Sequence, residues 1–280
     1  KGEYTNAVYG FLKMFFEILR RYKPDYIAVA FDRAAKTFRH IEYEDYKATR
    51  PPPPEELYPQ LPRLKEILNT LKVSIFELDG YEADDVLGTL AKQTDHHSNL
   101  NTYIVTGDRD TFQLITDKVF VLSPIHGFQQ CEIFTPQKVL EKYELKPSQI
   151  ADMKGLQGDN SDNIKGVRGI GPKTARTLLQ KYRNIENIYD HLDELPKTIK
   201  EKLENDKENA FFSKKLATIV TDVPLTLNLE SCKTHTYDKT KVENFFHELE
   251  FKSLLSKLGR VDHYYSGKRQ ENNEKQQSLF

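Results

Sequence analysis

The sequence predicts an α/β protein: a mostly parallel sheet flanked by helices (residues 1–134), then a helical region (residues 135–262) and a polar tail (residues 263–280). Three observations lead to this prediction. Short apolar runs alternate with segments of helical periodicity as far as residue 134, which is typical of parallel sheets. After Thr135 the apolar spacing is helical only. Acidic residues stand where several predicted strands end, which is the edge at which α/β sheets place their sites.

Apolar residues recur at helical spacing over residues 6–22, and Pro24 lies just past the end of that helix. The short apolar run 26–31 predicts a buried strand. Over residues 33–56 the pattern weakens and Pro51–Pro54 exclude a helix, so we expect either a mobile flap or an extended polyproline spacer. The rest of this part is predicted to hold helices at 57–71 and 83–92, strands at 73–78, 101–105, 119–122 and 132–134, and a short helical piece ending at Leu114.

The second part is predicted to be a series of helices. Their expected positions are 136–143, 148–156, 172–182, 185–192, 196–203, 209–220, 242–249 and 253–258. Residues 266–277 are polar and lack an apolar stripe, so we expect the tail to be disordered.

Composition excludes several classes of protein. The chain has 280 residues, 38% of them apolar and 30% charged, and no apolar run approaches the roughly 20 residues of a membrane span. No signal peptide is recognisable, and Lys1 in place of Met suggests a truncated or processed chain. Cys131 and Cys232 match no metal or redox spacing, which favours a reducing compartment such as the cytoplasm.

Charge is distributed unevenly although the net charge is only −1. No acid occurs from Asn163 to Ile185, where the bases are Lys165, Arg168, Lys173, Arg176, Lys181 and Arg183. A second basic set follows Asp32 and comprises Arg33, Lys36, Arg39, Lys47 and Arg50. Acidic segments flanked by basic ones suit a metal-dependent enzyme that acts on a polyanion.

The acidic motifs centre on residues 79–85. Glu82, Asp84 and Asp85 crowd together where a predicted strand gives way to a helix, and such carboxylates repel one another unless cations neutralise them. Taken alone, this group of three acidic residues is best explained as an ordinary acidic helix start. The pattern recurs, however, at Asp32, Asp108, Asp110, Asp159 and Asp162. Together these side chains predict a site for two Mg²⁺ or Mn²⁺ ions, which suits hydrolysis of a phosphodiester.

A second motif, residues 164–182, predicts a helix–hairpin–helix. Gly166, Gly169 and Gly171 permit a tight hairpin, and Pro172 is placed as the first residue of the next helix, where backbone N–H groups can meet a phosphate. A plain glycine turn between packed helices is the alternative. Lys173 and Arg176 near the helix start oppose the helix dipole, which favours phosphate binding.

These motifs resemble the 5′→3′ exonuclease domain of bacterial DNA polymerase I, a member of the flap endonuclease superfamily. The resemblance runs from about residue 5 to residue 259 and is carried by 30–33 with 37–40, 80–85, 106–110, 158–162 and 166–174. It implies a PIN-like nuclease core with an arch at about 33–56, a DNA-binding helical region, and cleavage of DNA or RNA primers with a 5′ flap.

The resemblance also implies roles for individual residues. The metal ligands would be Asp32, Glu82, Asp84, Asp85, Asp108, Asp110, Asp159 and Asp162. Arg39 and Lys47 would be catalytic, and Tyr46 and Arg50 would face DNA, with Tyr46 stacking on an unpaired base. The remaining DNA contacts would be Lys165, Gly166, Arg168, Gly169, Gly171, Lys173, Thr174 and Arg176, and K⁺ would bind the hairpin carbonyls.

One departure from the family concerns the start of the chain. The family opens with a strand ending in an Asp ligand, and no such strand precedes the segment that begins at Lys1. A catalytically impaired DNA-junction-binding fragment is therefore an alternative hypothesis. A phosphatase using Asp108 and Asp110 is a weaker one, because Phe112 stands where that motif requires Thr.

The end of the chain suggests two partners. Residues 276–280 resemble the pentapeptide that binds the bacterial sliding clamp, in which Leu279 and Phe280 would fill an apolar pocket. The family also implies that a polymerase domain can follow.

Overall fold

The computed structural model describes residues 2–125, 130–234 and 237–277, with side chains described as far as Tyr265. The chain forms two compact units. The first comprises residues 1–29, 52–76 and 228–280, and the second comprises residues 30–51 and 77–227. All eight predicted metal ligands belong to the second unit.

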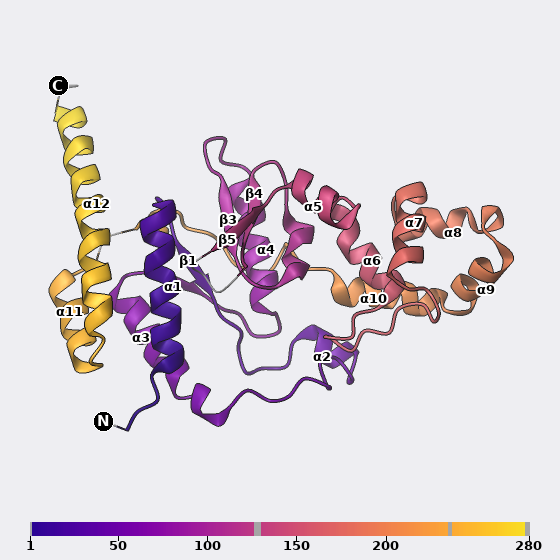
Figure 1. Cartoon of the computed structure of the whole chain (residues 1–280), viewed down its shortest axis with the longest axis horizontal. Coiled ribbons are helices and arrows are strands. Elements are labelled where there is room, and N and C mark those ends of the chain that lie inside the picture. Colours follow the sequence, from indigo (N-terminus) through magenta and orange to yellow (C-terminus); the bar gives the residue numbers. More distant parts are fainter. Residues whose placement is uncertain (1, 126–129, 235–236, 278–280) are drawn as a thin grey trace. The chain divides into compact units, whose positions relative to one another are not determined.

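The first unit is mainly helical. Its helices are α1 (Asn6–Tyr22), α3 (Gln60–Thr70), α11 (Lys239–Glu248) and α12 (Lys252–Gln277), with the 3₁₀ turns η1 (Glu55–Leu57) and η5 (Glu230–Cys232). Figure 1 shows α1 beside α12. The apolar face of α1 is buried there: Leu12 and Phe16 are at most 1% exposed, and the Phe16 ring meets Phe246 edge-on at a centroid distance of 5.9 Å. Two short strands, β1 (Ala28–Ala30) and β2 (Ser74–Phe76), pair as a sheet of their own.

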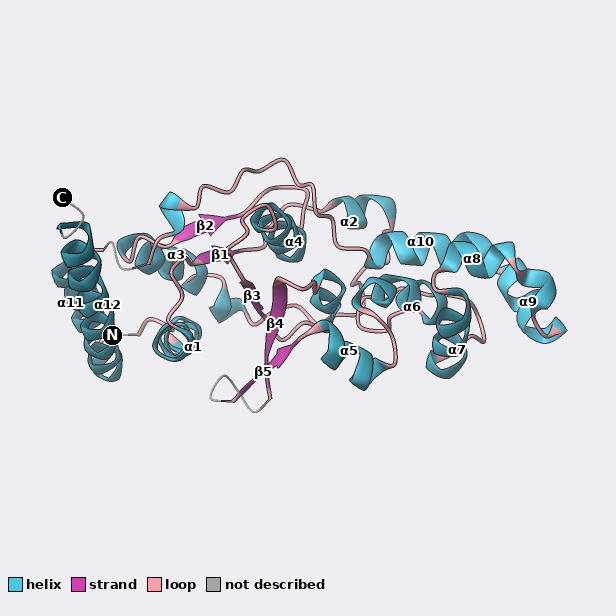
Figure 2. Ribbon diagram, turned by 90° about the horizontal axis from the view of Figure 1, so that it is seen from above, coloured by secondary structure: helices cyan, strands magenta, loops and turns pink. Residues whose placement is uncertain are grey.

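The second unit begins with an α/β part. Strands β3 (Thr102–Val105), β4 (Val119–Pro124) and β5 (Cys131–Phe134) form one sheet (Figure 2), accompanied by α2 (Phe38–Glu42), α4 (Ala83–Thr94), η2 (Arg109–Leu114) and α5 (Pro136–Tyr143). β3 and β4 are parallel, with Thr102 opposite Val119. β5 runs antiparallel to β4, because the connection between them is far shorter than a crossover requires. Apolar residues that include Ile104, Phe112 and Val121 form the core.

The helical part of the second unit follows α5. Its elements are η3 (Pro147–Gln149), α6 (Ile150–Gln157), α7 (Pro172–Tyr182), α8 (Ile185–Asp190), η4 (Leu192–Glu194), α9 (Lys197–Asn205) and α10 (Lys207–Ala217). α6 lies against α7 and α10 (Figure 2). A separate core joins them, in which Leu156, Leu179, Ile185 and Ile188 are fully buried.

The predicted α/β part followed by helices is confirmed, and α5 and α7 have the predicted bounds. The predicted helix 57–71 is divided into η1 and α3, with Pro59 before the first residue of α3. Residues 266–277 were predicted to be disordered, but in the structure they continue α12. These residues are rich in Lys, Glu and Gln, which favour a helix even without an apolar stripe. The predicted clamp-binding residues 278–280 lie outside the described part of the chain.

In the part of the chain that the structure describes, no helix combines the length and the apolar character needed to cross a membrane.

Candidate metal and nucleic-acid site

The fold brings acidic side chains from distant segments together. Oxygen atoms of Asp110, Asp159 and Asp162 all lie within 4.8 Å of one another, which is close enough to share a metal ion. Asp110 is in η2, whereas Asp159 and Asp162 follow α6, about fifty residues later in the chain. The sequence predicted a common site for these two motifs, and the structure brings these three of their carboxylates together.

A second acidic group surrounds Asp84. Burial, together with the charges of Asp108, Glu82 and Asp32, raises the pKa of Asp84 to about 7. Asp32 is also tied to this group, because its Oδ1 accepts a hydrogen bond of 2.8 Å from the backbone N–H of Ala83. These carboxylates therefore repel one another, as expected of side chains arranged to bind a cation.

Local backbone structure fixes several of these side chains. Glu82 is the N-cap of α4 and forms a capping box with Asp85. Asp108 caps η2, where its Oδ1 accepts a bond of 2.8 Å from the N–H of Asp110. Asp159 accepts bonds of 2.8 and 2.6 Å from the N–H and the hydroxyl of Ser161. The acidic residues are thus placed by helix starts and tight turns.

The turn that carries Asp159 depends on glycine. Gly158 has φ 77° and Gly166 has φ 65°, both in the region that favours glycine. A Cβ added at Gly166 would lie 2.2 Å from the backbone nitrogen of Gly158. The two segments are also joined by a backbone bridge between Asp159 and Ile164. The acidic turn and the start of the predicted hairpin therefore touch backbone to backbone.

Basic side chains of the protein neutralise the acidic cluster. Lys47 Nζ lies 2.6 Å from Glu82 Oε1, and Arg50 Nη2 lies 2.5 Å from Asp162 Oδ1. Lys154, on α6, donates to both Asp110 and Asp159. Lys47 and Arg50 were predicted at the site, but Lys154 was not. Its position five residues before Asp159 was the available signal, because a lysine one helical turn from an acidic turn can reach it.

The pKa values in this cluster follow from burial and pairing. Burial raises the pKa of Asp110 to about 6, although the ammonium of Lys154 opposes the rise. For Asp159, hydrogen bonds from Lys154 and Ser161 outweigh the effect of burial and lower the pKa. Lys154 itself has a raised pKa, because Asp110 and Asp159 outweigh its burial. At neutral pH the lysine thus serves as the counter-ion of a carboxylate pair.

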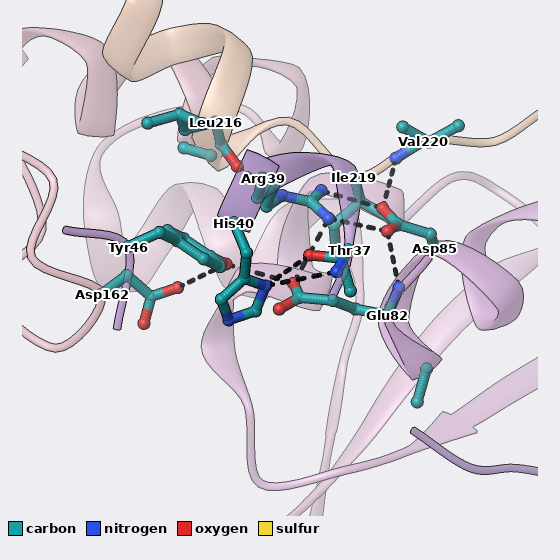
Figure 3. A network of polar contacts seen from close by, with 12 residues as sticks. Thr37, Arg39, His40, Tyr46, Glu82, Asp85, Asp162, Leu216, Ile219 and Val220 are labelled. Atoms are coloured by element: carbon teal, nitrogen blue, oxygen red, sulfur yellow. Dashed lines mark hydrogen bonds and ion pairs between the residues drawn. The ribbon is translucent and has the colours of Figure 1, made fainter. Parts of the chain in front are cut away.

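Arg39 and Asp85 are buried together, and their predicted roles as catalytic residue and metal ligand stay predictions. Both were expected at the reactive centre, but Arg39 is 3% and Asp85 0% exposed, and they bind each other (Figure 3). Tyr46 is 4% exposed, and its hydroxyl lies 3.1 Å from both Glu82 Oε2 and Asp162 Oδ2. Stacking of Tyr46 on a base stays a prediction, and it would require the ring to leave this buried position.

The glycine hairpin predicted before α7 is formed, and its binding of phosphate stays a prediction. Gly166 and Gly169 have positive φ, and α7 begins at Pro172 as expected. Lys165, Arg168 and Lys173 are exposed on this segment. Thr174 and Arg176 are half-buried, and Arg176 pairs with Glu144 at 3.3 Å. Gly171 has φ −95°, which any residue can adopt. The carbonyl of Gly169, one of the predicted K⁺ ligands, accepts a bond of 3.1 Å from Lys202 Nζ.

A pocket adjoins the acidic cluster. It has a volume of about 480 Å³. Its walls include Asp108 and Asp110, the cations Arg50 and Lys154, and an apolar side formed by Phe112, Tyr143, Ile150 and Met153. This volume falls in the range of small-molecule sites. The pocket thus has cations that suit a phosphate on one side and an apolar surface that suits a flat ring on the other.

Two family models match consecutive segments of the chain, which together cover residues 1–240. The model for a 5′-3′ exonuclease N-terminal resolvase-like domain matches residues 1–144. The model for a 5′-3′ exonuclease C-terminal SAM fold matches residues 145–240. The boundary between the two matched segments lies at the end of α5, where the α/β part gives way to the helical part.

Curated relatives and a solved structure are also similar. A DNA polymerase I of Caldicellulosiruptor bescii is 45% identical over 257 residues, which are 91% of this chain and 30% of that protein. A 5′-3′ exonuclease of Aquifex aeolicus is 38% identical over 265 residues, which are 93% of this chain and 88% of that protein. A bacteriophage T5 flap endonuclease, solved as a pseudo-enzyme-product complex with DNA and metal ions, has a TM-score of 0.63, 20% identity and 93% coverage of both chains.

Proposed function

The chain belongs to the 5′-3′ exonuclease family, and on this basis we propose that it is a structure-specific 5′ nuclease that cleaves 5′ flaps of DNA and removes RNA primers during replication and repair. The observation that carries this proposal is the convergence of Asp110, Asp159 and Asp162 within 4.8 Å. The chain spans 30% of the DNA polymerase I relative, so the activity of that longer protein is not transferred as a whole.

The side chains of the site suit divalent cations. Every candidate ligand atom is a carboxylate oxygen, which Mg²⁺ and Mn²⁺ prefer. Burial, with a contribution from neighbouring carboxylates, raises the pKa of Asp84 and Asp110, so added positive charge would stabilise their ionised forms. One ion would be held by Asp110, Asp159 and Asp162, and a second by Asp32, Glu82, Asp84 and Asp108. When bound, such a pair supplies an activated water and stabilises the leaving oxygen.

Residues of the chain itself would bind and orient the substrate. Lys47 and Arg50 reach the carboxylates from residues 45–50 and could turn to the scissile phosphate once cations take their place. Lys165, Arg168 and Lys173 are exposed along the hairpin and would bind phosphates of the duplex without reading bases. The pocket beside Asp108 would receive the nucleotide next to the scissile bond.

Several finer proposals follow from family membership. The cations in the cell would be Mg²⁺ or Mn²⁺, and a K⁺ ion at the hairpin would have to displace the Lys202 ammonium from the Gly169 carbonyl. A polymerase domain and, through residues 276–280, a sliding clamp are proposed partners. Such an enzyme would be located in the bacterial cytoplasm, at the nucleoid.

The test is cleavage of a duplex with a fluorescent 5′ flap. We expect cleavage with Mg²⁺ or Mn²⁺, none with EDTA, and a loss of at least about 100-fold in Asp110→Asn. Asp190→Asn is a matched control, because Asp190 is an exposed aspartate of α8 outside the cluster. Binding of the flap without cleavage in either metal would contradict a nuclease and support the junction-binding alternative.

A further inference from the structure

Arg39 and Asp85 form a buried, two-pronged ion pair (Figure 3). Arg39 Nη1 donates to Asp85 Oδ2 at 2.7 Å, and Nη2 donates to Oδ1 at 2.8 Å. Both side chains are almost completely buried, at 3% and 0% exposure. This is the planar geometry that guanidinium provides and ammonium does not.

The same two side chains hold a third segment of the chain. Arg39 donates from Nε to the carbonyl of Leu216 and from Nη2 to the carbonyl of Thr218, both at 2.8 Å. Asp85 Oδ1 accepts from the N–H of Val220 at 2.8 Å. The pair therefore ties α2 and the start of α4 to the backbone that leaves α10.

Glu82 is held by both members of the pair. Its backbone N–H donates to Asp85 Oδ2 at 3.1 Å, and its carboxylate Oε2 lies 3.3 Å from Arg39 Nη1. The backbone and the side chain of Glu82 are therefore both positioned by groups that do not face solvent.

We propose that Asp85 and Arg39 are positioning residues for Glu82, and that Asp85 is not itself a cation ligand. The oxygens of Asp85 already accept bonds from Arg39, Val220 and Glu82, so a cation would have to displace donors that are themselves buried. The role assigned to Glu82 rests on the proposed function, in which that carboxylate holds one of the cations.

Three variants test this inference. Arg39→Lys keeps the positive charge but loses the two-pronged geometry, and Asp85→Asn keeps the shape but loses the negative charge. The double variant Arg39→Met/Asp85→Asn removes both charges, so that no uncompensated charge stays buried. A matched control is Lys215→Met/Glu42→Gln, which removes an exposed ion pair between the same helices, α2 and α10.

The measurements are Mn²⁺ binding by calorimetry on the full chain without DNA, flap cleavage against Mn²⁺ concentration, and Tm. We expect all three variants to weaken Mn²⁺ binding at one site about 10- to 100-fold, with unchanged stoichiometry, as for other residues that orient metal ligands. Cleavage should recover at saturating Mn²⁺. The double variant should recover Tm but not Mn²⁺ affinity, and the surface control should change neither.

Two results would overturn the inference. If Asp85→Asn lost one Mn²⁺ per chain while Arg39→Lys kept the wild-type stoichiometry and affinity, Asp85 would be a ligand. If the variants lowered Tm but left Mn²⁺ affinity unchanged, the pair would only stabilise the fold. Absence of cleavage by the wild-type chain would instead overturn the proposed function, and the Mn²⁺ titrations would still decide the role of Asp85.

Discussion

The acidic cluster and the hairpin are both candidate parts of a nucleic-acid site, but their charges are arranged in opposite ways. In the cluster, the cations Lys47, Arg50 and Lys154 are already paired with carboxylates. In the hairpin, Lys165, Arg168 and Lys173 are exposed to solvent. The cluster must therefore exchange partners before it can bind divalent cations and a phosphate. The exposed cations of the hairpin would need no such exchange to meet a phosphate.

The largest expected effect separates the two regions. In Asp110→Asn/Asp159→Asn, we expect flap cleavage to fall by about 10²- to 10³-fold, because two of the three converging carboxylates are lost. DNA affinity, measured by fluorescence anisotropy in Ca²⁺, should stay within about threefold, since the hairpin is unchanged. An equal loss of binding and cleavage would mean that the two regions do not act separately.

The second prediction concerns the internal counter-ion. Lys154→Met leaves Asp110 and Asp159 together without their ammonium, so the metal-free protein should lose about 1–3 kcal/mol of stability. Added Mn²⁺ should restore most of the loss, because it supplies the missing positive charge. Tm with and without Mn²⁺ measures both effects. Lys173→Met removes an exposed lysine of α7 and should change the stability by at most about 0.5 kcal/mol.

The third prediction tests the hairpin. Lys165→Gln/Arg168→Gln should weaken binding of flap DNA about tenfold at moderate salt and reduce the slope of log K against log salt by about 1.8, or about 0.9 for each lost phosphate contact. Cleavage at saturating DNA should stay unchanged. Lys197→Gln, at an exposed position on α9, is the control for a simple loss of charge. An unaltered salt slope would show that the hairpin does not contact phosphates.

The smallest expected effect is a pH dependence confined to the cluster. The pKa of Asp84 is about 7 and that of Asp110 about 6, both raised from 3.8, so the folded state binds more protons than the unfolded state in this range. Stability of the metal-free protein should therefore fall as the pH rises from about 4 to about 7. We expect Tm to fall by only a few degrees over this pH range, because solvent screens part of the repulsion.

Two variants check the source of that pH dependence. Asp84→Asn should flatten the Tm profile between pH 5 and pH 7, whereas the hairpin double variant should leave it unchanged. The lowered pKa of Asp159 acts in the opposite direction, and only below about pH 4, where protonation of that carboxylate removes its bonds with Lys154 and Ser161. A wild-type profile that rises from pH 5 to pH 7 would contradict the assignment.

The sequence predicted well which acidic residues come together. It did not predict which side chains from distant segments hold them in place. Asp110 and Asp159 could be found because acids at strand ends and tight turns follow a local pattern. The hairpin could be found because Gly166 and Pro172 each have a specific backbone role. Both depend on neighbours in the chain, which a sequence shows directly.

Partners distant in the chain could not be found in this way. Arg39 and Asp85 bind each other across 46 residues, so their burial depends on tertiary packing that no local periodicity reveals. Lys154 was missed for a related reason: a lysine on a helix is most often exposed, and only the fold shows that this one lies between two carboxylates. The antiparallel pairing of β4 with β5 is likewise a contact that the fold reveals.

The contact between Gly158 and Gly166 limits how this protein can be changed. Because these two backbones touch and Asp159 is bridged to Ile164, the turn that bears the candidate ligand Asp159 is joined through its backbone to the loop that would grip the duplex. A graft that replaced residues 164–171 alone with a loop from another DNA-binding protein would shift Asp159 as well. An engineer who wishes to alter substrate preference would have to transplant the segment from Leu156 onward as a block, since the N–H of Val167 is bonded to the carbonyl of Leu156 at 2.8 Å.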